Sequence, residues 1–268
     1  MNRVLFSTAA VLALAGAAMA RPVYSNGPFV TGIGNGFGGG NTSTIEPDYT
    51  SFGTGTNEAA LPANGGPVRV ADDFTVTGPG WNLNTATFYM YQTVASPATN
   101  PLVNTITSIR VGIYNASPSG TDATPDLGDF STNRLAGAVF TNTFRVTSTT
   151  LTDDNRAIFA ITADLSDFPD LLPGSYWLAW STTGSNPSGP WQVPVTPTGA
   201  GNGATARQFF DPALTGNGSW ADLDGTASLP GIQHVDLAFD LDYTLIPAPS
   251  AALAFVGAGL VGLRRRRN

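Results

Sequence analysis

Three carboxylates occur close together in one stretch of the chain. Asp122, Asp126 and Asp129 lie in the segment DATPDLGD, and Asp222 and Asp224 form a second acidic turn in DLDG. Carboxylate oxygens at such short spacings are suitable ligands for calcium. Neither stretch matches the twelve-residue EF-hand loop, so both could instead be ordinary solvated turns, which Asp commonly forms. Calcium at Asp122, Asp126 and Asp129 is the one metal site, and the one cofactor, that the sequence suggests.

Two of the five tryptophans lie in segments rich in turn-forming residues. Trp191 follows Ser-Gly-Pro, and Trp220 follows Gly-Asn-Gly-Ser. Exposed indole rings at the edge of a sheet could stack on sugar rings, so Trp191 and Trp220 are candidates for binding a polysaccharide. The more common role of such rings is to close the ends of a hydrophobic core.

Catalytic groups are scarce. The chain has one histidine, His234, and no cysteine, which excludes thiol nucleophiles and disulfides and disfavours catalytic zinc. A Ser–His–Asp triad would need His234 as its base, and the chain has no G-x-S-x-G elbow. The only glutamates, Glu46 and Glu58, lie in a Gly-rich stretch, and the sequence places no carboxylate pair across a cleft. We therefore expect no enzyme, with a glycan-active hydrolase as the least favoured alternative.

The charge of the chain is strongly uneven. All 12 basic residues are Arg, and residues 21–247 hold 7 of them against all 19 acids, so this part carries a net charge of 7 − 19 = −12. Such an acidic surface repels phosphate backbones, so we expect no binding to nucleic acid. The apolar share of 42% is enough for a sizeable core.

The central part of the chain reads as one strand after another. Several segments alternate apolar and polar residues, as in Leu237, Phe239, Leu241 and Tyr243, which are out of phase with the nearby aspartates and predict a half-buried strand with its acids facing solvent. The predicted strands cover 68–76, 81–93, 105–114, 135–147, 156–164, 175–181, 207–210 and 234–245.

These strands predict an all-β fold, an antiparallel β-sandwich or jelly roll, over residues 68–245. The preceding segment, 21–67, is rich in Gly, Asn and Thr, and we read it as loops and turns with at most one short strand.

Both ends of the chain have the features of export signals. Arg3 and an apolar run precede Ala18-Met19-Ala20, a small-x-small site at which signal peptidase would cut after residue 20. At the other end, Ser250 to Leu263 is an uncharged run, and the four arginines Arg264, Arg265, Arg266 and Arg267 follow directly. We expect a short helix in the lipid bilayer, with the arginines on its cytoplasmic side.

The order of features in 246–267 resembles the PEP-CTERM sorting tail, in which a Pro-x-Pro motif, an apolar helix and an Arg cluster follow one another. Here the motif is Pro247, Ala248 and Pro249, with Ala in place of the family's Glu. The resemblance implies processing by exosortase, a membrane protease-transpeptidase, and a destination in the cell envelope or outside the cell. It identifies an address and leaves the activity open, so a structural, matrix or adhesion role and a calcium-assisted carbohydrate-binding module both remain.

Residues 70–245 also resemble a poorly characterised domain of secreted bacterial proteins, for which no activity is established. The resemblance implies the fold and export and says little about function. It rests on the segments VADDFTV (70–76), GWNLNTATFYMYQT (80–93), TNRLAGAVFTNTFRVT (132–147), LPGSYWLAWSTTG (172–184) and SGPWQVPVT (188–196).

Overall fold

Strands make up nearly all the regular structure of the described chain. A computed structural model describes residues 21–45, 53–58, 67–94, 102–121, 124–197, 200–210, 218–223 and 235–247. Within them lie the 3-10 helix η1 (Phe37–Gly39) and the strands β1 (Val23–Ser25), β2 (Asn41–Thr44), β3 (Thr54–Gly55), β4 (Val68–Val76), β5 (Trp81–Tyr91), β6 (Ile106–Tyr114), β7 (Leu127–Asp129), β8 (Leu135–Val146), β9 (Ala157–Asp164), β10 (Gly174–Gly184), β11 (Trp191–Gln192), β12 (Arg207–Phe210), β13 (Ser219–Asp222) and β14 (Phe239–Leu245).

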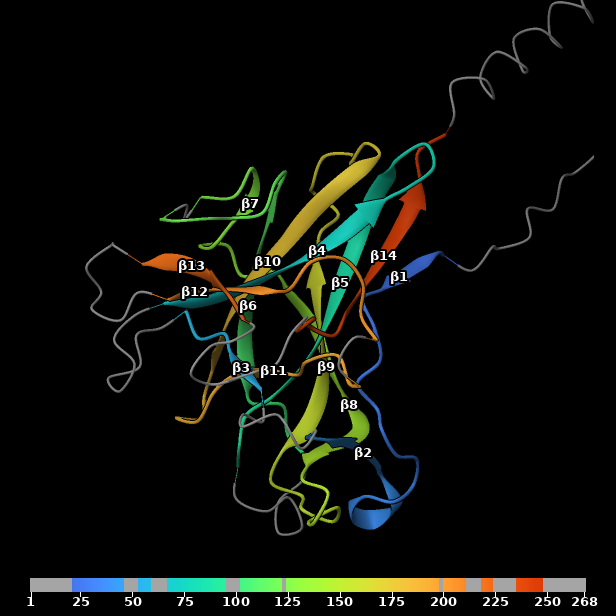
Figure 1. The fold of residues 1–268 in the computed structure, drawn as a ribbon, viewed down its shortest axis with the longest axis vertical. Coiled ribbons are helices and arrows are strands. Elements are labelled where there is room, and N and C mark those ends of the chain that lie inside the picture. The colour runs from blue at the N-terminus through green and yellow to red at the C-terminus, as the bar shows by residue number, and fades with distance from the viewer. Residues whose placement is uncertain are drawn as a thin grey trace, which may run out of the picture.

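The strands form two sheets that pack face to face (Figure 1). Sheet A has the order β1-β14-β5-β9-β8-β2, and β11 joins it beside β5 and carries β3. Sheet B has the order β13-β12-β4-β10-β6-β7. All pairings between named strands are antiparallel except that of β2 with β8. The predicted all-β sandwich is therefore confirmed.

Aromatic side chains from the two sheets meet in the core. Trp180 of β10 lies with its ring 4.7 Å from that of Phe88 of β5 and 5.9 Å from that of Phe239 of β14, and all three are fully buried. Strand alternation explains this, because side chains two apart in a strand share one face. Trp177 has the opposite phase to Trp180, and it joins a second, smaller cluster with Tyr114 and Trp220 on the outer side of sheet B.

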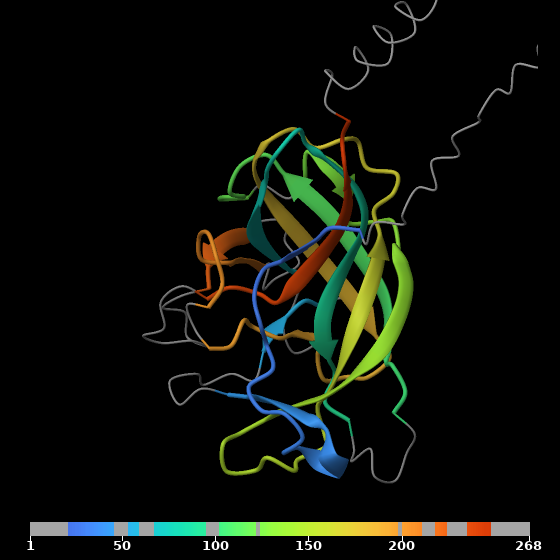
Figure 2. The same ribbon diagram turned by 90° about the vertical axis from the view of Figure 1, so that its right-hand side faces the viewer.

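The N-terminal segment is built into the sandwich. β1 pairs with β14, β2 with β8, and β3 with β11, so the described parts of 21–67 extend sheet A. The prediction of loops and turns with one short strand is therefore wrong, because the long strands offer edges on which three short segments can pair. Figure 2 shows this segment running along the length of the sheet from β1 to η1. The predicted signal segment, 1–20, and the predicted tail helix lie outside the described residues.

Both described ends of the chain leave the sandwich at the same pole. In the register of β1 with β14, Val23 lies opposite Asp242, in the middle of β14. The Arg21 guanidinium lies 3.7 Å from the Asp242 carboxylate, and the Tyr243 N–H donates to the Pro22 carbonyl at 3.3 Å. η1 and β2 lie at the opposite pole (Figure 1).

Candidate functional site

Three aspartates lie near the part of β4 that extends beyond its pairing with β12. β12 pairs with β4 only from Val68 to Ala71, so Asp72 and Asp73 stand just beyond the last pair. The segments 200–206 and 235–238 lie against these two residues, since the Ala204 N–H donates to Asp73 and the Leu237 N–H donates to Asp72. The second segment carries Asp236. The Ala206 N–H donates to the Val235 carbonyl at 2.8 Å, which ties the two crossing segments together. We refer to Asp72, Asp73 and Asp236 as the acidic cluster.

Asp72 is the innermost member of the acidic cluster. It shares the core-facing phase of β4 with Val70 and Phe74, and it is fully buried. Its Oδ2 accepts hydrogen bonds from the Leu237 N–H at 2.6 Å and from Asn26 Nδ2 at 2.7 Å. Burial raises the pKa of Asp72 well above its ordinary value, and the N–H donors oppose that rise.

A chain of side-chain hydrogen bonds links Asp72 to the surface. Asn202 Nδ2 donates to Tyr24 Oη at 2.8 Å, and the Tyr24 hydroxyl donates to Asn26 Oδ1 at 3.0 Å. Asn26 then donates to Asp72, so its amide has one orientation that satisfies both neighbours. Burial also raises the pKa of Tyr24, which keeps the hydroxyl protonated as a donor.

Asp236 differs from the other two aspartates because its charge is not compensated. The residue is only 5% exposed, yet among the described residues no group donates a hydrogen bond to its carboxylate or forms an ion pair with it. Burial, and then the charge of Asp73, raise the pKa of Asp236 to about 7. The prediction that Asp236 faces solvent is wrong, because the backbone of Gly201 lies against its carboxylate and covers it.

Two glycines bring the crossing loop onto the carboxylates. A Cβ at Gly201 would lie 2.0 Å from Asp236 Oδ2, and one at Gly203 would lie 2.1 Å from Asp73 Oδ2. The backbone can approach this closely only because neither residue has a side chain. Asp73 Oδ1 also accepts the Ala204 N–H at 2.6 Å. Both carboxylates therefore line the same short stretch of backbone, whose residues Asn202 and Gly203 are exposed.

The aspartates predicted to bind calcium have other partners. Asp129 accepts hydrogen bonds from the backbone and hydroxyl groups of Ser131 and Thr132, at 2.6 to 2.9 Å, and these bonds lower its pKa. Asp126 accepts the Asn115 N–H at 2.7 Å. Asp122 lies outside the described residues. Both described aspartates thus act as turn-stabilising side chains, the alternative reading of this loop.

The two candidate tryptophans lie in different sheets. Trp220 of β13 is 5% exposed and packs against Phe209 and Tyr114, so it presents no open ring face for a sugar. Trp191 of β11 is half-buried, and its indole N–H donates to Ser188 Oγ at 3.4 Å. The structure does not bring the two rings together on one surface.

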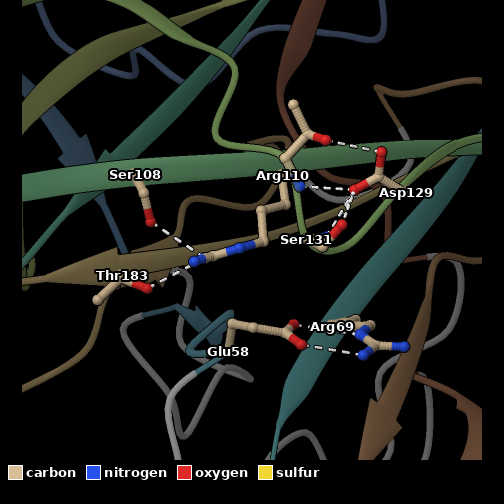
Figure 3. A network of polar contacts seen from close by, with 8 residues as sticks. Glu58, Arg69, Ser108, Arg110, Asp129, Ser131 and Thr183 are labelled. Atoms are coloured by element: carbon tan, nitrogen blue, oxygen red, sulfur yellow. Dashed lines mark hydrogen bonds and ion pairs between the residues drawn. The ribbon is translucent and has the colours of Figure 1, made fainter.

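Arginines on the outer face of sheet B are satisfied by their neighbours (Figure 3). Arg69 forms a double hydrogen bond with Glu58, at 2.9 and 3.2 Å, and its guanidinium lies 4.1 Å from the centre of the Phe130 ring. Arg110 donates to Ser108 at 3.1 Å and to Thr183 at 3.2 Å. The first set of contacts joins β4 to Glu58, the second joins β6 to β10, and we assign both a structural role.

The remaining predicted sites lie mostly beyond the described chain. Pro247 is described and exposed, whereas Ala248, Pro249, Arg264, Arg265, Arg266, Arg267, Ala18, Ala20 and His234 lie outside the described residues. The part of the chain that the structure describes holds no apolar helix of membrane-spanning length. Within it, no three acidic or histidine side chains are arranged to hold a metal ion.

Comparison with known protein families, curated proteins and solved structures found no match for this chain. The resemblance of its tail to PEP-CTERM proteins, and that of its central part to a secreted bacterial domain, therefore stay predictions from the sequence.

Proposed function

We propose that this chain is an exported protein that its C-terminal tail holds at the cell envelope, where the sandwich serves a non-catalytic structural, matrix or adhesion role. The observation that carries the proposal is the exit of both chain ends at one pole. Because β1 runs antiparallel to β14, the position that follows the expected signal cleavage lies beside Asp242 and Tyr243, a few residues before the tail. A sandwich tethered there has one end near the bilayer and the other away from it.

The described sandwich reaches to the beginning of the expected sorting motif. The Ile246 N–H donates to the Gly80 carbonyl at 3.1 Å, so the last described hydrogen bond of the chain is one residue before Pro247. A bilayer helix over 250–263 would therefore keep this pole within a few residues of the membrane surface. The sorting motif, Pro247-Ala248-Pro249, would lie between the folded domain and the lipid, where an exosortase-type membrane protease could reach it.

The same pole exposes apolar side chains. Val23, Leu172 and Leu245 are 59%, 66% and 54% exposed. Pairing brings them to one end, because Trp81 lies opposite Leu245 in β14 and forms a bridge with Leu171. Exposed apolar groups gathered at one place favour contact with another apolar surface. Their position beside the start of the tail supports a sandwich that stands on the membrane at this pole.

Fractionation of cells that express the full chain tests the proposal. We expect the full chain in the membrane fraction, accessible to a protease added outside, and a chain ending at Ile246 in the soluble exported fraction. A matched variant with Arg264–Arg267 replaced by Ser separates the contribution of the charges from that of the apolar run. Identical fractionation of the full and shortened chains would refute the tethering.

A further inference from the structure

Within the described chain, β8 has an open backbone edge. Its partners among the described strands are β9 on one side and β2 on the other, and β2 pairs only with residues 143–146. Figure 2 shows β8 along the outer edge of sheet A, beyond β9. Residues 136–141 of β8 therefore have a strand neighbour on one side only, and such an edge is a template for another strand.

The hydrogen bonds between β8 and β9 follow a regular alternation. The Asp164 N–H donates to the Arg134 carbonyl at 2.9 Å, and the Arg145 N–H donates to the Arg156 carbonyl at 2.9 Å. The extra residues of the two register shifts lie in β8, so β9 runs without interruption between these two bonds. In an antiparallel pair every second residue exchanges hydrogen bonds with its partner. The even-numbered residues of β9 are therefore the ones that bond to β8.

This alternation identifies the free backbone groups of the edge. Val139 lies opposite Ala160, an even-numbered residue, so its N–H and C=O point toward β9. Ala138 and Phe140 occupy the alternate positions, opposite Ile161 and Phe159. Their N–H and C=O groups therefore point away from β9, to the open side of the strand.

The open edge lacks the side chains that usually keep strand edges apart. Such edges commonly carry charged residues or proline, whereas residues 135–144, LAGAVFTNTF, include neither. Val139, at the middle of the edge, is 68% exposed. Residues 21–247 carry a net charge of 7 − 19 = −12, which repels a second copy over most of the surface. This uncharged edge is a place where a second copy can approach.

We propose that two copies of this chain pair through this edge, β8 against β8, in antiparallel orientation about a two-fold axis at Val139. In this register Ala138 of each copy lies opposite Phe140 of the other, so the free N–H and C=O groups of each satisfy those of its partner. The two Val139 side chains meet at a non-hydrogen-bonded position, where Cα atoms are about 4.5 Å apart. Because the same surface is used on both copies, the contact closes into a pair and builds no fibre.

The direction of β8 determines how the two copies are arranged. β14 runs toward the pole where the tail begins, and the antiparallel steps from β14 to β5, β9 and β8 make β8 run away from that pole. An antiparallel pair of β8 strands therefore has its two tail poles at opposite ends. If the tail holds each copy at a cell envelope, as the proposed function states, the pair joins two facing surfaces. The adhesion would then be between copies of the same protein, whereas the pairing itself does not depend on the tail.

A single pair should be weak. Register shifts interrupt β8 on both sides of residues 137–140, which leaves a short regular edge. The contact therefore falls in the class of small interfaces, which bury less than about 1,200 Å² and are commonly transient. Many copies on one surface compensate for this, because linked contacts raise the overall avidity by about 10²- to 10⁴-fold.

Aggregation of beads that carry the exported chain, residues 21–268, tests the pairing without a bilayer. The chain is coupled through its C-terminus in a mild detergent, and beads with the unmodified chain should aggregate. Val139→Lys and Val139→Asp each bring like charges together across the two-fold axis, so each should lower aggregation at least about tenfold. A mixture of Lys-variant and Asp-variant beads should aggregate again, because opposite charges then face each other. Val139 is exposed, so both variants should fold, and circular dichroism checks this.

The matched control is Val103→Lys, which changes a valine of similar exposure, 64%, outside β8. Its beads should aggregate as those of the unmodified chain do. Three results would overturn the proposal: dispersed beads with the unmodified chain, undiminished aggregation of the Val139→Lys beads, or a mixture of the two Val139 variants that stays dispersed. Cell fractionation tests the tether and the beads test the pairing, so either can fail while the other holds.

Discussion

Replacing Asp236 by asparagine should stabilise the protein at alkaline pH. The pKa of Asp236 in the folded protein is about 7, against an ordinary value of 3.8. The folded state therefore keeps a proton that the unfolded chain releases at lower pH, so folding stability is full below about pH 4 and falls as the pH rises toward about 7. Asparagine at this position cannot ionise, so the variant should lack this loss.

The structure also gives the size of the expected change in the free energy of unfolding. The two pKa values differ by 7 − 3.8 = 3.2, which corresponds to about 4 kcal/mol for a group without access to water. Solvent at the exposed residues Asn202 and Gly203 screens the charge, so we expect about 1 to 2 kcal/mol. For a domain of this size, that is a rise in melting temperature of about 2 to 8 °C at pH 8, and almost none at pH 4.

Thermal unfolding of both proteins at intervals from pH 4 to pH 8, with a chelator present, measures this difference. The charge of Asp236 also contributes to the raised pKa of Tyr24 and of Asp72, so its removal should lower both pKa values, which changes folding stability at alkaline pH in the same direction. The control is Asp126→Asn, an exposed aspartate outside the cluster. If the two melting curves keep the same separation at all pH values, or if the variant is less stable at pH 8, the reasoning about an unpartnered buried charge is wrong.

Three further predictions concern stability, each measured by urea unfolding. Asn26→Ala should cost about 1 to 3 kcal/mol, because it removes the buried acceptor of the Tyr24 hydroxyl and one of the donors to Asp72. Asn202→Ala, at the exposed end of the chain of hydrogen bonds, should cost less than about 0.5 kcal/mol, and equal losses would contradict the scheme. Gly203→Ala should cost about 1 to 3 kcal/mol, because Gly203 has φ +84° and a Cβ would meet Asp73, while Gly137→Ala, with open space around it, should be nearly neutral. Trp180→Ala should cost about 3 to 5 kcal/mol, because it empties a fully buried position between the sheets and removes the bond to Gln192, and a smaller loss would mean that the core collapses around the gap.

Local patterns predicted the long strands well. The bounds of β4 agree with prediction, and those of β5, β6, β8 and β9 agree to within two residues, because alternation over eight or more residues is a strong signal. Trp177 and Trp180 are three residues apart in a predicted strand, a spacing that puts their rings on opposite faces, and in the structure only Trp180 enters the main core. Short strands such as β1 and β2 lack such a pattern. They form because β14 and β8 present backbone groups with which they can pair.

The acidic cluster could not be predicted from local sequence patterns. Asp72 and Asn26 are 46 residues apart, and Asp72 and Leu237 are 165 apart, so only the folded topology joins them. In the sequence, Asp72 and Asp73 are neighbours within a predicted strand, and Asp236 looks like the solvent face of an alternating strand. The signal that was available is the core-facing phase of Asp72 with Val70 and Phe74, which marks an aspartate inside a buried stripe.

The junction between β14 and the tail has a mechanical consequence. Tension applied to the chain beyond Pro247 acts along the axis of β14, whose hydrogen bonds to β5 and β1 run perpendicular to that axis. The load is then shared by many bonds in shear, and the strand cannot be unzipped one bond at a time from its end. A sandwich pulled by flow or by neighbouring cells would therefore resist extraction of its last strand better than one held by a terminal strand at a sheet edge.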